Sequence, residues 1–273
     1  MASSKSESYF DVLTAAINDF VEHGYDDPSR VSYWSERLRQ AAEQSATPPP
    51  IMDRMMREQL VAIYRALLEK GGLSKYHGRV DRYTLQRIAP RLRSELDRRI
   101  LASASLIRLN REEAIQLTLK RFQGWATSIP AGGSEALRKQ RTKAEVRKPM
   151  ASLPFVERRV LIDQGHKLTA AINDIVAQDG GAIAAIWHSN WRQAGYDYRD
   201  THKARDGKVY LIRNSWAHKA SYVKPGKAGY LDEITQPGEE VFCRCYVSYE
   251  YAISELPLDM ISKKGAEALR KVA

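Results

Sequence analysis

Apolar residues recur at three- and four-residue spacing through the first two-thirds of the chain, and this pattern ends at Gly180-Gly181. Such spacing places apolar side chains on one face of an α-helix and predicts packed helices. After the two glycines the apolar residues come in short β-like runs instead. The sequence therefore predicts an α+β protein that is predominantly α, with a helical N-terminal region followed by a small α+β C-terminal domain.

Helix starts in the later part of this region are marked by proline and by N-cap residues. Pro90 is expected to open a fourth helix, and Asn110 with Glu113 forms a capping-box-like start for a fifth. A sixth helix should begin at residues 152–154 (Ser-Leu-Pro) and run to about Gln178. The predicted N-terminal region is thus a series of separate helices.

The stretch over residues 129–151 breaks the apolar pattern. It contains Gly132-Gly133 and then several basic residues, so we interpret it as an exposed basic linker or a solvated helix and place the domain boundary there. The expected organisation is a helical region over 1–128, this linker, an α+β module over 152–255 and a basic tail over 256–273.

Three runs within the module predict β-strands. Residues 182–187 are apolar and compact, and residues 208–213 follow the turn signal Asp206-Gly207. Residues 241–249 alternate, which is typical of a strand with one buried face. One face of that strand would carry Val241, Cys243, Cys245 and Val247.

The chain has a net charge of +10, from 43 basic and 33 acidic residues. Such an excess favours polyanionic partners, namely nucleic acid, an acidic membrane surface or an acidic protein. Two basic runs, 87–99 and 138–148, could neutralise DNA phosphates without reading sequence, although both could equally be solvated helix faces. The candidate nucleic-acid contacts are Arg91, Arg98, Arg99, Arg138, Lys139, Arg141, Lys143, Arg147 and Lys148.

The sequence lacks the signals of several other protein classes. Its first ten residues have no apolar secretory core, and no segment approaches the roughly 20 apolar residues that span a bilayer. The only two cysteines make no disulfide framework, which fits synthesis in the cytoplasm. Because no apolar span is present, we predict no membrane partner. No phosphate-binding glycine loop, catalytic triad order or paired-carboxylate motif is present either, so we predict that the protein is not an enzyme.

Cys243 and Cys245 are candidate metal ligands because residues two apart share one face of a strand. His202 could be a third ligand, and a structural zinc site would take a fourth from His188 or His218. Alternatively, both thiols pack as small buried apolar groups and no cofactor is needed. The candidate cofactor is therefore a structural zinc ion, or none.

Arg199 and His202 also admit an enzymatic interpretation. In a metal-independent nuclease, a histidine would act as general acid or base and an arginine would stabilise the phosphate. The alternative is that Arg199 locks a turn through an ionic or hydrogen-bonded contact and His202 donates to a backbone carbonyl. Trp187 and Trp191 are expected to lie in the core of the module instead of stacking on bases.

Five features follow one another in this module: a tryptophan, an Arg-x-x-His, an Asp-Gly turn, a Pro-Gly loop and a closing Cys-Arg-Cys. This order resembles the C-terminal module of the phage minor head, or head-morphogenesis, family to which the Mu F protein belongs. The resemblance covers residues 153–249. Family members often place a small polar residue such as Asn before Cys-Arg-Cys, where this chain has Phe242. The motif falls on Trp187, Arg199, His202, Asp206, Gly207, Pro237, Gly238, Cys243, Arg244 and Cys245.

The resemblance implies a structural protein of the virion head, made in the host cytoplasm and present in several copies at or near the portal vertex. Its implied role lies in head morphogenesis and in DNA packaging or ejection. The implied partners are the portal protein, the major capsid or scaffold protein, and DNA without sequence preference. Two alternatives stay open: a nuclease or toxin-like domain built on Arg199 and His202, and a DNA-binding protein of the host.

Overall fold

The computed structural model describes residues 7–68, 73, 77–129 and 141–272, except for the side chains of Arg141 and Val272. The described chain is predominantly helical, with a small three-stranded antiparallel sheet in its C-terminal part, which confirms the predicted fold class. It divides into two compact units, each built from two segments. The first unit comprises residues 1–56 with 102–160, and the second comprises residues 57–101 with 161–273.

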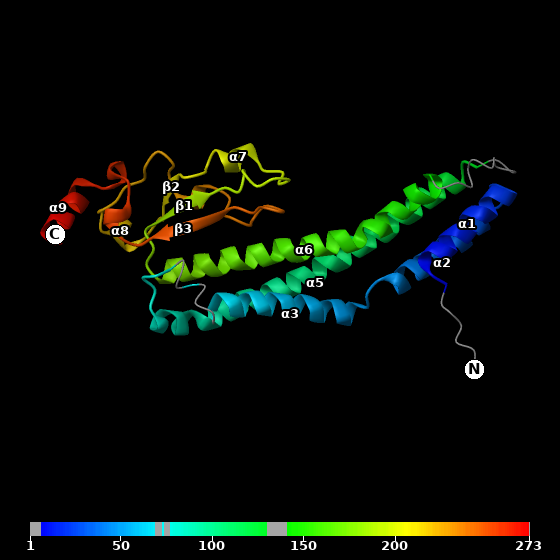
Figure 1. Ribbon diagram of the computed structural model, residues 1–273, viewed down its shortest axis with the longest axis horizontal. Helices are drawn as coiled ribbons and strands as arrows, with labels where there is room; N and C mark the ends of the chain where they lie inside the picture. Colours follow the sequence, from blue (N-terminus) through cyan, green and yellow to red (C-terminus); the bar gives the residue numbers. More distant parts are fainter. Residues whose placement is uncertain (1–6, 69–72, 74–76, 130–140, 273) are drawn as a thin grey trace. The chain divides into compact units, whose positions relative to one another are not determined.

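The elements are named as in Figure 1. The long helices are α1 (Tyr9–His23), α2 (Pro28–Ser45), α3 (Pro49–Leu68), α5 (Arg82–Ala126) and α6 (Arg141–Asp179). The strands are β1 (Ala184–His188), β2 (Val209–Leu211) and β3 (Tyr246–Glu250). The short helices are α7 (Asp200–Lys203), α8 (Trp216–Lys219), η2 (Leu231–Glu233), η3 (Ile253–Glu255), η4 (Leu258–Met260) and α9 (Lys263–Val272).

The predicted fourth and fifth helices are one continuous helix, α5, with Pro90 in its interior. The capping-box signal at Asn110 is overridden by tertiary contacts at the next residue. Arg111 is buried, forms an ion pair with Glu157 and donates to the carbonyl oxygen of Thr47. These contacts hold the middle of α5 in the first unit, so the helix does not restart there.

The predicted sixth helix begins earlier than expected, because α6 starts at Arg141 and passes through Pro149 and Pro154. Residues 141–151, which were predicted to belong to the linker, are therefore helical. Val146 and Met150 explain this, since both are buried in the core of the first unit. Neither unit boundary falls within 129–151.

The first unit has a core formed by α1, α2 and the parts of α5 and α6 that belong to it. Helix α1 begins with a capping box between Ser8 and Asp11. Phe20, Phe122 and Trp125 pack with their rings at centroid distances of 5.7–6.3 Å. Aromatic packing of this kind contributes strongly to core stability.

The helical part of the second unit buries one stripe from each of α3, α5 and α6. Leu60, Leu92 and Leu168 are all fully buried in this core. Gly165 permits the close approach of α3, because a Cβ at this position would lie 2.8 Å from the Cδ1 atom of Ile63. This packing fixes the helix that supports the sheet.

The sheet of the second unit has the order β2-β1-β3, with β1 antiparallel to both neighbours. The register pairs Ala185 with Tyr210 on one side and with Tyr249 on the other. These residues and Trp187 lie in a core that also contains Ala177 of α6, and Figure 1 shows the strands beside the C-terminal end of α6. The opposite face of β1 carries Ala184, which packs in a second core.

Two expectations about the C-terminal part need correction. The strand predicted over 241–249 is shorter: β3 begins at Tyr246, because Phe242 adopts a left-handed φ of 58° and interrupts the extended backbone. Val241, expected to be buried with the two cysteines, is 58% exposed. The predicted tail is part of the second unit, since Met260 is buried in the same core as Ala184. None of the helices in the described ranges combines the length and apolarity needed to cross a membrane.

Candidate metal centre

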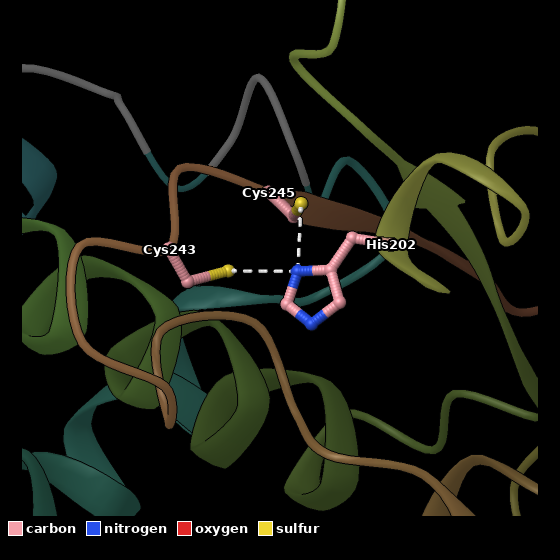
Figure 2. A group of neighbouring side chains, drawn as sticks. All are labelled: His202, Cys243 and Cys245. Atoms are coloured by element: carbon pink, nitrogen blue, oxygen red, sulfur yellow. Dashed lines mark hydrogen bonds between the residues drawn. The ribbon is translucent and has the colours of Figure 1, made fainter. Parts of the chain in front are cut away.

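His202, Cys243 and Cys245 form a buried cluster in the second unit (Figure 2). The imidazole comes from α7, and the two thiols come from the loop that precedes β3. His202 Nδ1 lies 3.6 Å from Cys243 Sγ and 3.5 Å from Cys245 Sγ. The three ligand atoms lie within 4.8 Å of one another, so these residues could hold a metal ion.

The separation of these atoms suits a tetrahedral ion. With Zn–N of about 2.1 Å and Zn–S of about 2.3 Å, tetrahedral angles place the nitrogen about 3.6 Å from each sulfur. Both distances in the cluster agree with that value. The cluster therefore has the donor types of a Cys₂His site, and the distances from its nitrogen to its two sulfurs suit such a site.

The orientation of His202 is set from the other side of its ring. Nε2 lies 2.9 Å from Glu240 Oε1, and Arg199 Nε lies 2.6 Å from Glu240 Oε2. Because the ionised carboxylate can only accept, Nε2 carries a proton, and Nδ1 is the ring nitrogen that faces the thiols. The hydrogen bond from His202 is the main cause that lowers the pKa of Glu240, which keeps this carboxylate ionised. Histidines that bind metals commonly donate their other ring N–H to a carboxylate in this way.

A hydrogen bond between the two thiols shifts their pKa values in opposite directions. The bond from Cys245, helped by backbone donors and by His202, lowers the pKa of Cys243 to about 5 despite burial. The same bond and burial raise the pKa of Cys245. The lowered pKa of Cys243 favours its thiolate, and thiolate is the form that binds metal.

The loop that carries the cysteines, residues 241–245, is fixed by hydrogen bonds from several segments. The backbone N–H of Phe242 donates to Oδ1 of the buried Asp163 on α6, at 2.7 Å. Arg199 donates to the carbonyl oxygen of Val241 at 2.9 Å, and the backbone N–H of Arg244 donates to the hydroxyl of Tyr196 at 3.1 Å. The loop is therefore held in place by side chains from other segments.

The Pro-Gly step lies directly on α6. Pro237 and Gly238 are both buried, and Gly238 has a φ of 83°. A Cβ at Gly238 would lie 3.3 Å from the Cα atom of Lys167. The position requires glycine for both the left-handed backbone and the close approach to the helix.

The Asp-Gly turn follows α7 and leads directly into β2. The Asp206 carboxylate accepts from the backbone N–H of Ser189 at 2.8 Å and from Trp191 Nε1 at 3.0 Å, and the first of these is the main cause that lowers the pKa of Asp206. Gly207 has a φ of 73° and donates to the carbonyl oxygen of Trp187. The turn thereby fixes the end of β1, where the fully buried Trp187 packs edge-on against His202 at 5.4 Å.

The structure separates the predicted site residues into those that meet and those that do not. The ten motif residues all belong to the second unit, and the Trp187 side chain is in the core as expected. Trp191 is only half-buried and lies near Arg192 and Lys203. Within the described residues, neither His188 nor His218 joins the metal cluster, because His188 bonds to Ser248 and His218 to Tyr230.

Sequence reasoning missed several residues that complete the site. Glu240 lies three positions before Cys243, and an acidic residue so close to Cys-Arg-Cys could have been a signal. Asp163 and Tyr196 gave no signal, since their roles depend on the tertiary approach of α6 and of the loop before α7.

The candidate DNA contacts lie in both units. Arg91 forms an ion pair with Asp179, and both Arg98 and Arg99 pair with Glu95. In the first unit, Arg147 and Lys148 are exposed and Lys143 is half-buried. Arg138 and Lys139 lie outside the described residues, as does the side chain of Arg141.

Comparison with known proteins found no matching protein-family model, no matching curated protein and no matching solved structure. The resemblance to the phage minor head family therefore rests on the ordered motif. The site itself rests on the geometry of the described residues.

Proposed function

We propose that this protein is a minor head (capsid) structural protein of a tailed phage, located in the virion head at the portal vertex or in the head interior. It would act in head morphogenesis, DNA packaging or ejection. The observation that carries the proposal is the convergence of the motif: Trp187 packs against His202, which meets Cys243 and Cys245 in one buried cluster. Arg199 joins this cluster through Glu240, and the backbone of Gly238 hydrogen-bonds to Cys243. Motif residues that occur in the family order and also lie together in space are better explained by membership of the family than by a chance match of the sequence.

The proposed role of the cluster is structural, with zinc as the ion. His202, Cys243 and Cys245 would bind it, and the ion would tie α7 to the loop before β3 in a domain with a small core. The hydroxyl of Ser189, 3.8 Å from Cys245 Sγ, is a neighbouring oxygen, and a water molecule is the other candidate for the fourth donor. Bound zinc supplies a cross-link between segments distant in sequence, as in other small metal-stabilised domains.

The nuclease alternative receives less support from the same geometry. His202 is 1% exposed, one ring nitrogen bonds to Glu240, and the other faces two thiols. A general acid or base must reach the substrate with a free nitrogen. Arg199 bonds to Glu240 and to the Val241 carbonyl, which is the turn-locking contact expected of a structural arginine.

The proposed partners are the portal protein, the major capsid or scaffold protein, and DNA bound without sequence preference. The side chains of Arg91 and Arg98 are more than half exposed, and Arg147 and Lys148 are exposed on α6. Exposed cations of this kind neutralise phosphates in a salt-dependent manner. The third alternative, a host DNA-binding protein, would share this property and have no affinity for head proteins.

Quantitative mass spectrometry of purified phage particles and of DNA-free procapsids tests the proposal. We expect the chain in both samples at a constant low ratio to the portal protein. Its absence from both, while it is abundant in infected cells, would overturn the proposal and would direct attention to nucleic-acid cleavage by the purified chain.

A further inference from the structure

The second unit contains a cavity of about 350 Å³ beside the metal cluster. Its wall is formed by α5, α6, the Pro237-Gly238 loop and the start of β3, and Cys245 contributes to it. This volume falls in the range of pockets that enclose small ligands. Neither the structural role of the cluster nor the family motif assigns a ligand to this cavity.

Cations line the cavity from three elements. Arg98 and Arg99 come from α5, Lys167 from α6, and Arg244 from the loop before β3. Arg98 and Arg99 both donate to the one carboxylate of Glu95, so this trio carries one positive charge in a fixed arrangement. Preorganised guanidinium groups are suited to bind phosphate oxygens.

Arg244 adds a second charge to the cavity. Its guanidinium lies 5.3 Å from the centroid of the Tyr196 ring, and within the described residues it has no ion-pair partner. The carboxylates in the wall are Asp174 and Glu239. Burial is the main cause that raises the pKa of Asp174, whose carboxylate accepts hydrogen bonds from Gln178 and Tyr249. An anion is therefore favoured at the part of the cavity lined by Arg98, Arg99 and Arg244.

The remaining lining groups suit a flat heterocycle better than a bare anion. Tyr246 stacks on His188 at a centroid distance of 4.7 Å and stays 49% exposed, so part of its ring is open to a ligand. The side-chain amides of Asn173, Asn190 and Gln236 also line the cavity. Aromatic rings stack on nucleobases, and amides pair with the edges of bases.

We infer that this cavity binds a single nucleotide unit, with the phosphate near Arg98 and Arg244 and the base against Tyr246. The nucleotide could be free or could belong to a DNA strand, because both present the same phosphate and base. This inference does not depend on the proposed role in the phage head.

Isothermal titration of the full-length chain tests the inference. The ligands are the four deoxynucleoside monophosphates, inorganic phosphate and a short single-stranded oligodeoxynucleotide. We expect saturable binding of a nucleotide with one site per chain, at least tenfold weaker in Arg98→Ala and in Arg244→Ala. Tyr246→Ala should weaken nucleotide binding and leave the weaker phosphate binding unchanged.

Arg93→Ala is the matched control. Arg93 lies on the same helix as Arg98, its side chain is 57% exposed and it pairs with Asp97 at i+4, but it does not line the cavity. Binding of the oligonucleotide alone would support the inference with DNA as the source. Absence of saturable binding by both nucleotide and oligonucleotide, equal affinity for inorganic phosphate, or equal loss in Arg93→Ala would overturn it.

Discussion

Glu240 accepts a hydrogen bond from His202 Nε2 at 2.9 Å, and this bond leaves Nδ1 facing the thiols of Cys243 and Cys245. The relationship explains why the motif joins an Arg-x-x-His to a Cys-Arg-Cys. Arg199 bonds to the second oxygen of the same carboxylate, so arginine and histidine are held by one acidic residue. The two cysteine sulfurs contact the other ring nitrogen of His202, Nδ1.

Glu240→Gln should weaken zinc binding roughly 10- to 100-fold, the usual effect of removing a carboxylate that accepts from a metal-bound histidine. The amide can still accept from His202 but no longer carries the charge that raises the basicity of the ligand. Competition with a chromogenic chelator measures the affinity. Glu239→Gln is the control, because this neighbour does not contact His202, and an equal loss in both variants would contradict the assignment.

Phe242→Asn should stabilise the protein by about 1 kcal/mol, the order of the cost of a left-handed backbone for an ordinary L-residue. Phe242 has a φ of 58°, and asparagine tolerates this region better than phenylalanine. Urea unfolding of both proteins at the same zinc concentration provides the measurement. Phe242→Val should have the opposite effect, since β-branched residues tolerate this conformation poorly; stabilisation by Val and not by Asn would exclude backbone strain.

His77 should make the second unit sensitive to acid. Its side chain is buried between Tyr251 Oη at 2.5 Å and Asn173 Oδ1 at 3.2 Å, it stacks on Tyr249, and burial lowers its pKa from 6.5. Because the folded pKa lies below the unfolded one, the unfolded state binds the proton first. The free energy of unfolding therefore falls as the pH drops below about 6.5.

The comparison of wild type with His77→Gln isolates this contribution from the metal ligands. Urea midpoints at pH 7.5 and 5.5 should differ less in the variant, while its stability at pH 7.5 should be lower because the hydrogen bonds of the imidazole are removed. An identical pH dependence in both proteins would show that His77 does not titrate on unfolding.

Replacement of Lys143, Arg147 and Lys148 by glutamine should weaken DNA binding at low salt. For each phosphate that the variant no longer neutralises, the slope of log K against log salt should fall by about 1. Fluorescence anisotropy with two unrelated duplexes measures the slope and should show equal affinity for both. An unchanged slope would place the DNA-binding surface elsewhere, for example at Arg91 and Arg98.

Local spacing and residue chemistry were enough to predict three features. These are the apolar faces of the helices, the fold class, and the grouping of His202 with the two cysteines. Helix α5 could not be predicted as one element, since Arg111 stabilises its middle through contacts with Glu157 and Thr47. The late start of β3, at Tyr246, was equally hidden, because the alternating residues 241–249 do not mark Phe242 as left-handed. Glu240 became part of the site only when the fold brought it against α7.

The measurement that tests the central claim most directly is the zinc content of the purified chain, by native mass spectrometry and elemental analysis. We predict one zinc ion per wild-type chain and none in His202→Ala or in Cys243→Ser. Chelation should lower the Tm of the wild type and leave that of folded Cys243→Ser unchanged. A wild-type protein that binds no zinc at micromolar concentrations and keeps its Tm in chelator would contradict the account.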